Sequence, residues 1–405
     1  MTATTRKTTV GVVFGGRSVE HDVSIITANQ IMRAFDPALY DVVPVYVSRD
    51  GRWYTGAPLL DIKNYESEIV SHKGIAQVVL SPAVQHHGLI VNPVSGRFSR
   101  SEVLRLDVVF PAIHGTHGED GTLQGLLELA DIPYVGCGVL ASAVANDKIT
   151  AKALLNQHSI PVIEGISFSR ADWLGDPDAV IARIERTLAF PVFVKPATTG
   201  SSIGIGRVSD VGLLRAAIDI AAHFDRRVLV ERAVTGGVEV NCAVLGNGND
   251  LRASVLEQPV SWEEFLTYDE KYRRGSEGMK SAERIIPAPI DPALTAKIQE
   301  YALRAFRAID GRGTARVDFL VKPEKGEIWL NEINTMPGSL AFYLWQESGI
   351  SAAELVHQLI LLAREAHAEK RRTSFDYQTD LIALAAMRGL KGVKGAKGGV
   401  EKARA

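Results

Sequence analysis

Four polar side chains in the C-terminal third of the chain could hold a divalent cation. Arg316 and Asp318 alternate along one predicted strand, and Glu332 and Asn334 alternate along the next. Because successive side chains of a strand point to opposite faces, each pair shares a face. The strands flank Pro323–Gly326, which has the composition of a hairpin turn. Pairing about its midpoint places Asp318 nearly opposite Glu332, within one residue of register.

Cross-strand neighbours lie about 5 Å apart, which is close enough for two carboxylates and an amide oxygen to share one hard cation. Oxygen ligands of this kind suit Mg²⁺, which binds carboxylates together with substrate phosphates. Arg316 beside them would offset negative charge that develops on a phosphoryl or carbonyl oxygen. The same alternation is also typical of the solvated face of an ordinary hairpin, so the spacing alone leaves both interpretations open.

A second group of residues could bind anions and a nucleotide. Lys195 ends a predicted strand, and the loop after it is rich in glycine and serine, including Ser201 and Ser202. Such a loop can turn backbone N–H groups inward around an anion, although a hairpin without a ligand has a similar composition. It lacks the GK[ST] ending of a P-loop. Glu231 and Glu239, on or beside strands, could bind ribose and adenine, but glutamates are also common at strand ends.

The elements predicted around these residues alternate in the manner of an α/β protein. The predicted strands are 10–14, 42–47, 108–112, 191–195, 203–208, 228–231, 238–245, 253–260, 315–321 and 327–333, and the predicted helices are 23–35, a helix ending at 129, 147–157, a helix ending at 223, 292–309 and 352–366. In open α/β sheets the loops at the carboxyl ends of strands gather ligands, so residues 15–20 and 114–120 are candidates for one crevice. We expect no regular element at residues 49–105. Residues 261–288 have the length and composition of a lid, and residues 388–405 those of a disordered tail.

The composition excludes several classes of protein. The chain has 405 residues, 46% of them hydrophobic, and a formal charge of −2. These values exclude a disordered chain, and the balanced charge argues against a nucleic-acid-binding protein. Cys137 and Cys242 form no CxxC pair, which fits a reducing compartment. The apolar run 10–14 is too short for a signal peptide or a membrane span, so we expect a soluble, cytoplasmic protein with no membrane partner.

Six motifs follow one another along the chain. They are FGGRSVEHDVS at 14–24, HGTHGEDGTLQG at 114–125, Lys195-Pro196 with Gly200-Ser201-Ser202, EKY at 270–272, Arg316-Val-Asp318 and NEINTMPG at 331–338. In this order they resemble the D-alanine–D-alanine ligases, an ATP-grasp family, over about residues 8–365. The resemblance implies a mixed α/β and α+β protein, with an ATP-grasp fold preceded by an N-terminal parallel-sheet (pre-ATP-grasp) domain. The implied parts are residues 1–146, 147–233, 234–366 with the lid at 261–288, and an extension at 367–405.

The resemblance also implies the nucleotide and metal sites. ATP would lie between the central and C-terminal parts, with two Mg²⁺ ions, for which Mn²⁺ can substitute, on Asp318, Glu332 and Asn334. The residues matched to the nucleotide are Lys148, Lys195, Ser201, Ser202, Glu231, Val234, Glu239 and Lys271. From the sequence alone, Lys148 would be read as a solvated lysine at a helix start.

The amino-acid site follows from the same resemblance. Glu20 matches the residue that receives the ammonium of the first D-alanine, and His114 lies near that substrate. Arg316 and the amide of Gly338 match the groups that stabilise the tetrahedral oxyanion. Ser201 and Tyr272 match the members of a hydrogen-bonded triad with Glu20. The implied reaction is ATP-dependent formation of D-alanyl-D-alanine through an acyl phosphate, as a cell-wall precursor, by a homodimer.

One position departs from the family. Where the family commonly has a serine five residues after the glycine matched by Gly338, this chain has Tyr343. Tyr343 or Ser339 could take over the contact with the carboxylate of the second substrate. An alternative is therefore a related ligase with another second substrate, such as D-lactate, D-serine or another amino acid. A non-catalytic nucleotide-binding regulator is a third hypothesis, but the expected ligand and clamp residues are all present.

Overall fold

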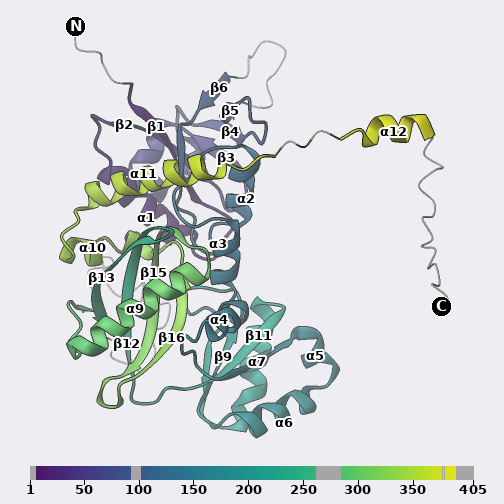
Figure 1. Cartoon of the computed structure of the whole chain (residues 1–405), viewed down its shortest axis with the longest axis vertical. Helices are drawn as coiled ribbons and strands as arrows, with labels where there is room; N and C mark the ends of the chain where they lie inside the picture. The colour runs from purple at the N-terminus through teal and green to yellow at the C-terminus, as the bar shows by residue number, and fades with distance from the viewer. Residues whose placement is uncertain (1–5, 93–101, 261–283, 376, 378, 389–405) are drawn as a thin grey trace, which may run out of the picture. The chain divides into compact units, whose positions relative to one another are not determined.

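The computed structural model describes residues 6–92, 102–260, 284–375, 377 and 379–388, and the chain forms two units, residues 1–367 and 368–405 (Figure 1). The first unit contains three sheets, each in its own range of the chain. The division of that unit into domains at residues 146 and 233 stays a prediction. Among the described residues, no helix is long and apolar enough to cross a membrane.

The N-terminal sheet has seven strands in the order β6-β5-β4-β3-β2-β1-β7. Its parallel part pairs β1 with β2 and β7, and β1 is buried along most of its length, as a strand covered on both faces should be. Helix α1 packs on β1. The bounds are β1 Thr8–Gly15, α1 His21–Ala34, β2 Tyr40–Val47, β3 Trp53–Thr55, β4 Ala76–Leu80, β5 Gly88–Val91, β6 Glu102–Arg105, β7 Val108–Pro111, α2 Thr122–Leu129 and α3 Val139–Asn146.

The expectation of no regular structure at 49–105 is wrong. Strands β3 to β6 extend the sheet there as an antiparallel meander. Three short 3₁₀ helices, Ala57–Leu60, Ile62–Glu66 and Ile69–Ser71, connect β3 to β4. Each of these strands has only three to five residues, too few for a clear alternation of apolar and polar residues.

The central sheet is antiparallel, with the order β10-β9-β11-β8. Helix α4 precedes this sheet in the chain. Its N-cap is Asp147, whose carboxylate accepts a hydrogen bond from the amide of Thr150 at 2.8 Å. Strand β10 is shorter than the 203–208 predicted, because Ser201–Gly204 form a turn. The bounds are α4 Lys148–Gln157, β8 Gly165–Ser169, α5 Arg170–Gly175, α6 Pro177–Thr187, β9 Val192–Pro196, β10 Gly206–Val208, α7 Val211–Phe224 and β11 Arg227–Arg232.

The C-terminal sheet has the order β14-β13-β12-β15-β16. Helix α9 packs on it and begins at Pro292 after the N-cap Asp291, an arrangement that suits a helix start. The predicted lid, residues 261–288, overlaps the described part of the chain from residue 284 onward. Its residues Arg284–Ile285 form the edge strand β14 instead. The bounds are β12 Val238–Asn247, β13 Asp250–Pro259, β14 Arg284–Ile285, α9 Pro292–Ala308, β15 Arg312–Lys322, β16 Glu327–Asn334, the 3₁₀ helix η6 Gly338–Ala341, α10 Phe342–Glu347 and α11 Ala352–Lys370.

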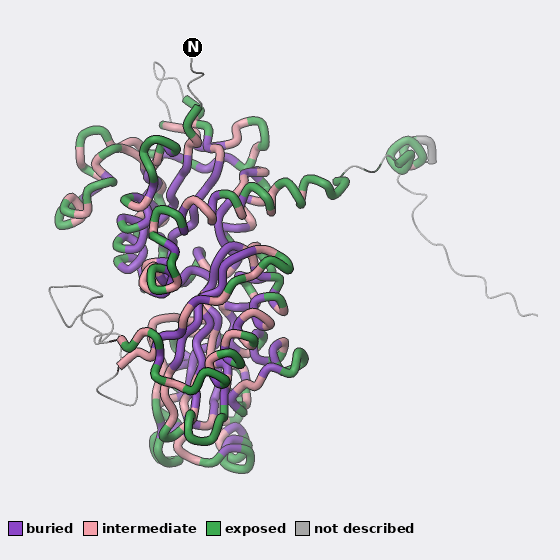
Figure 2. The backbone as a smooth tube through the Cα atoms, turned by 60° about the vertical axis from the view of Figure 1, so that its left-hand side comes forward, coloured by how far each residue is buried: buried purple, intermediate pink, exposed green. Residues whose placement is uncertain are grey.

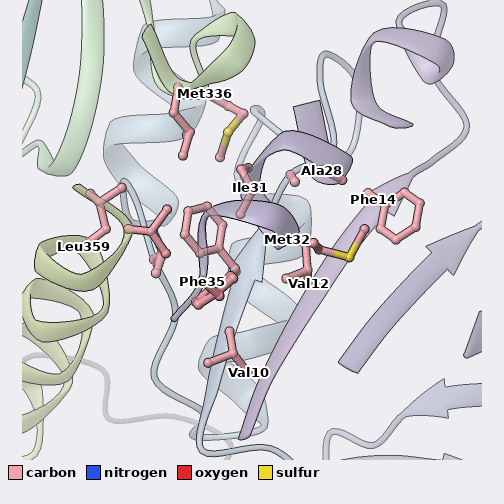
Figure 3. Close-up of a cluster of buried hydrophobic side chains, with 14 of the residues drawn as sticks. Val10, Val12, Phe14, Ala28, Ile31, Met32, Phe35, Met336 and Leu359 are labelled. Carbon is pink, nitrogen blue, oxygen red and sulfur yellow. The ribbon is translucent and has the colours of Figure 1, made fainter. Parts of the chain in front are cut away.

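One apolar core joins the start of the first unit to its end. The buried cluster around Phe14 and Ile31 also contains Met336 and Leu359 (Figure 3). Buried stretches of the backbone lie in the interior of this unit (Figure 2). The loop after β16 therefore packs directly on helix α1. This contact brings residues near 20 and residues near 338 to one place.

The second unit contains one described helix, α12 Leu381–Arg388, which the sequence reading did not anticipate. Most of its described residues are exposed. The predicted disordered tail, apart from Arg388, lies outside the described residues.

Candidate functional site

A cavity of about 210 Å³ is lined by residues of the central and C-terminal parts and by loop residues of the N-terminal part. Its wall includes Asn241, Glu257 and Asn331, which the sequence reading did not single out. The predicted site residues in its wall are Glu20, His114, Lys148, Lys195, Ser201, Ser202, Glu239, Arg316, Asp318, Glu332, Asn334, Gly338 and Tyr343. Among the described residues, Glu231, Val234 and Ser339 are predicted site residues that this wall does not include. Lys271 and Tyr272 lie outside the described residues.

The acidic strands pair as their spacing predicted. Asp318 on β15 is in register with Glu332 on β16, and Arg316 is in register with Asn334. A bulge follows between Asp318 and Phe319, which changes the register beyond the acidic pair. Arg316 forms a two-point ion pair with Asp318, with both N–O distances 2.7 Å, and the amide of Asn334 donates to Asp318 at 2.8 Å.

The electrostatics of this pair reflect burial. Burial raises the pKa of Asp318 to about 7 despite the opposing effect of Arg316, and Glu239 and Glu332 contribute in the same direction as burial. The pKa of Arg316 lies well above its usual value; burial opposes that rise and the contact with Asp318 produces it. An added divalent cation would offset this excess of acidic side chains.

These side chains fit a Mg²⁺ ion whose coordination is completed by oxygens of a bound substrate. Two carboxylates and one amide oxygen are too few for a closed all-protein site, and the described residues contain no group of three or more His, Cys, Asp or Glu arranged for a metal. Mg²⁺ commonly takes one or two carboxylates and completes its shell with water and phosphate oxygens. Asp318 and Glu332 meet that requirement, and Asn334 is the third candidate ligand.

Two lysines, one on helix α4 and one on strand β9, face these carboxylates. Lys148, the first residue of α4, donates to the carbonyl of Thr199 at 2.7 Å and lies 3.8 Å from a carboxylate oxygen of Glu332. Lys195, at the end of β9, donates to the amide oxygen of Asn331 at 3.2 Å. Both ammonium groups therefore lie beside the acidic strands, where they can bind phosphate oxygens.

Glu231, which the resemblance matches to the nucleotide, is buried against two lysines. Its side chain is 1% exposed and forms ion pairs with Lys152 at 2.6 Å and Lys195 at 2.7 Å. Burial alone would raise the pKa of Glu231, but the two lysines outweigh burial and lower it. Lys152 was missed by the sequence reading. Its position four residues after Lys148, on the same face of one helix, was a usable signal.

The N-terminal part contributes Glu20, the residue before helix α1. The hydroxyl of Ser201 donates to its carboxylate. A Cβ at Gly115 would lie 2.5 Å from that carboxylate, and a Cβ at Gly200 would lie 2.7 Å from it. Both loops therefore need glycine for close approach to Glu20. The arrangement brings the loop after β7 and the loop after β9 around one carboxylate.

Glu119 connects the same loop to the C-terminal sheet, and the sequence reading also missed it. Its carboxylate accepts from the amide of Gly115 at 2.8 Å and from the amide of Met336 at 3.0 Å. Burial, aided by the nearby Glu20, raises the pKa of Glu119 to about 8. The GEDG segment in which it lies was the available signal.

His114 and Thr27 form a second connection. The Nε2 atom of His114 lies 3.0 Å from the hydroxyl of Thr27, which also accepts from the amide of Ser339 at 3.3 Å. Burial, and secondarily Arg316, lowers the pKa of His114 to about 4, so this imidazole is neutral at pH 7. Ser339, Leu340 and Ala341 all have positive φ, near 50°, a conformation that side-chain contacts on both sides must maintain.

Two lysines, one on α4 and one on β9, therefore face carboxylates on the C-terminal sheet in one cavity, and the loop before α1 adds the carboxylate of Glu20. This fold and this site define an ATP-grasp ligase. A model of the D-ala D-ala ligase N-terminus matches residues 9–137, and a model of the C-terminus of these ligases matches residues 154–361. The chain belongs to the D-alanine–D-alanine ligase family.

Known proteins resemble the chain along nearly its whole length. The D-alanine–D-alanine ligase of Acetivibrio thermocellus is 42% identical, over 88% of this chain and 96% of its own. That of Natranaerobius thermophilus is 39% identical over 92% and 99%. Among solved structures, the VanG D-Ala:D-Ser ligase from Enterococcus faecalis matches with a TM-score of 0.76 at 33% identity, over 88% and 100%. The D-alanine–D-alanine ligase from Coxiella burnetii matches with a TM-score of 0.75 at 29% identity, over 95% and 99%.

Proposed function

We propose that the protein is an ADP-forming ligase that joins two D-alanine molecules for cell-wall precursor synthesis. Family membership supports this reaction, and one observation in the structure carries it. Glu20, Arg316 and the Asp318–Glu332 pair line a single cavity with two lysines. The chain therefore provides a carboxylate for an amino group, cations for phosphates and a cation for an oxyanion within one cavity.

In the first step, Glu20 receives the ammonium of the first D-alanine, and the neutral His114 lies beside that substrate. The carboxylate of this D-alanine attacks the γ-phosphorus of ATP, the bond to the β-phosphate oxygen breaks, and ADP leaves. Lys148 and Lys195 bind the phosphates. Divalent cations on Asp318, Glu332 and Asn334 would offset the charge of the transferring phosphoryl group.

In the second step, the deprotonated amine of the second D-alanine attacks the acyl carbon. The C–N bond forms, the C–O bond to phosphate breaks, and inorganic phosphate leaves with the proton that the amine nitrogen loses. Arg316 and the amide of Gly338 stabilise the tetrahedral oxyanion between these events. Because an acyl phosphate hydrolyses readily, the site must exclude water while this intermediate is present.

The remaining nucleotide contacts concern the ribose, the phosphates and the adenine. Glu239 lines the cavity and is the candidate for ribose, with Ser202 on the phosphate side. Val234 is the candidate for the adenine pocket, and Glu231 acts there by holding Lys152 and Lys195. We also place the reaction in the cytoplasm, where ATP is available, and we expect a homodimer, which sedimentation velocity would test.

Product analysis tests the proposal. The protein is incubated with ATP, Mg²⁺ and D-alanine, alone or with D-lactate, D-serine or L-alanine, and products are identified by mass spectrometry alongside phosphate release. We expect D-alanyl-D-alanine as the main product. A mixed product in preference to it would change the second substrate, and phosphate release without any ligated product would remove the ligase function.

A further inference from the structure

A second polar cluster lines the cavity beside the acidic strands. The hydroxyl of Tyr343, on α10, donates to Glu257 at 2.7 Å, and the amide of Asn241 donates to the same carboxylate oxygen at 3.0 Å. The guanidinium carbon of Arg284, on β14, lies 4.0 Å from the centre of the Tyr343 ring. These residues come from β12, β13, β14 and α10, and the mechanism above uses none of them.

Glu257 holds this cluster together. Its side chain is 3% exposed and receives two hydrogen bonds within 3.0 Å, from Tyr343 and Asn241. Arg284 adds a longer contact of 3.3 Å through one nitrogen. Glu257 therefore has two close donors without Arg284. Burial raises the pKa of Tyr343, so its hydroxyl keeps the proton that it donates.

Arg284 keeps most of its hydrogen-bonding capacity. A guanidinium has five N–H donors, and among the described residues Glu257 is its acceptor. The side chain is 25% exposed and lines the cavity. Stacking on Tyr343 fixes the guanidinium plane while its N–H edges remain available, and a fixed plane suits a carboxylate.

The other cations of the described cavity wall have closer partners or lie on the phosphate side of the cavity. Both guanidinium contacts of Arg316 go to Asp318 at 2.7 Å. Lys148 and Lys195 lie against Glu332 and Asn331, on the phosphate side. Arg284 is the remaining cation, and it shares the cavity with Arg316 and Gly338, where the acyl carbon would lie.

We propose that Arg284, stacked on Tyr343 and oriented by Glu257, binds the carboxylate of the second substrate. The inference rests on the proposed function, and it gives Tyr343 a supporting role in place of the serine usual in the family. It requires an acceptor that carries a carboxylate next to its nucleophile. Tyr343 and Glu257 are positioning residues, and Arg284 touches the substrate.

The test compares acceptors with and without that carboxylate. D-Alaninamide has no carboxylate to be phosphorylated, so it can enter only as the second substrate. Wild type and Arg284→Ala are given ATP, Mg²⁺, D-alanine and D-alaninamide, and D-alanyl-D-alanine and D-alanyl-D-alaninamide are quantified. We expect the preference of the wild type for the carboxylate acceptor to fall about 10- to 100-fold in R284A, the range for loss of a charge-assisted contact.

A separate assay isolates the first step. Hydroxylamine traps the acyl phosphate as D-alanine hydroxamate without using the second amino-acid site. We expect R284A to form hydroxamate at a rate close to that of the wild type, which also shows that the variant is folded. If the wild type forms neither hydroxamate nor dipeptide, the proposed function fails, whatever Arg284 does.

Two further variants complete the design. Arg215→Ala is the matched control, because Arg215 also stacks on an aromatic ring, that of Trp173, and pairs with a carboxylate, that of Asp178, outside the cavity. It should leave the acceptor preference unchanged. Arg284→Lys, which keeps the charge without the planar fork, should fall between R284A and wild type. An unchanged preference in R284A that still forms hydroxamate would overturn the proposal.

Discussion

Ser201 donates a hydrogen bond to Glu20 across 181 positions of sequence. The contact joins the turn after β9 to the residue before α1, and therefore joins the phosphate side of the cavity to the amino-acid side. Two glycines, Gly115 and Gly200, leave the space that this carboxylate occupies. Glu20 thus contacts this turn, and the proposed reaction also gives it the ammonium group of the first D-alanine.

Ser201→Ala tests this double role. We expect KM for the first D-alanine to rise about tenfold, since a hydrogen bond to a charged group is lost, while KM for ATP changes less. Steady-state kinetics with each substrate varied in turn measures both constants. Ser209→Ala, at an exposed position, is the control. Equal increases in both constants would show that Ser201 acts on the nucleotide instead.

Asp318→Asn tests the metal assignment. Loss of a carboxylate should reduce kcat by about 100-fold or more, because transition-state charge is then less well offset, and excess Mg²⁺ should restore part of the activity. The measurement is kcat as a function of Mg²⁺ concentration. Glu327→Gln, at the exposed start of β16, should behave like the wild type. Activity of D318N equal to wild type at every Mg²⁺ concentration would remove Asp318 as a ligand.

The Lys152–Glu231–Lys195 cluster predicts unequal effects of two substitutions. Glu231→Gln leaves two buried ammonium groups without their carboxylate, which should cost about 3–5 kcal/mol of stability. Lys152→Met leaves a one-to-one pair of Glu231 and Lys195 and should cost clearly less. Thermal unfolding of both variants without nucleotide tests this order. A larger loss of stability in K152M would contradict it.

His114 predicts a pH-dependent stability with a definite sign. Its pKa falls from 6.5 to about 4 in the fold, so below pH 6.5 the unfolded chain binds a proton that the folded chain does not. Stability from His114 is therefore complete above pH 6.5 and is lost as the pH falls toward 4, with about 2 kcal/mol lost at pH 5.

The check compares the wild type with His114→Gln in urea unfolding at pH 7 and pH 5. The wild type should lose more stability between these pH values than the variant, by about the amount given above. Comparing the two proteins cancels the contributions of all other titrating groups. Parallel losses in both would show that His114 is accessible to protons in the folded protein.

The sequence predicted most of what is periodic or local. Alternation along β15 and β16 and a short turn were sufficient to place Asp318 opposite Glu332, because a hairpin register depends on neighbours in the chain. The apolar runs that form β1, β2 and β7 were also sufficient to predict these strands. The motifs that indicated the family lie partly within strands β9, β15 and β16 and partly in the loops and helix starts that follow strands.

Contacts between distant segments could not be predicted in this way. Lys152 and Glu119 have partners 79 and 217 positions away, and nothing in their local pattern specifies those partners. Arg284 lies beside a segment with little periodicity, which hid the edge strand β14. The short strands at 49–105 have too few residues for their alternation to be distinguished from a loop.

The side chains around the cavity carry unequal numbers of opposite charges. Its described wall contains six acidic residues, Glu20, Glu119, Glu239, Glu257, Asp318 and Glu332, against the four permanent cations Lys148, Lys195, Arg284 and Arg316. When Glu119 is protonated and Asp318 is ionised, five acidic residues still face four cations, so a bare triphosphate meets net repulsion. We therefore expect the nucleotide to enter already complexed with a divalent ion, and a chelator to lower its association rate first.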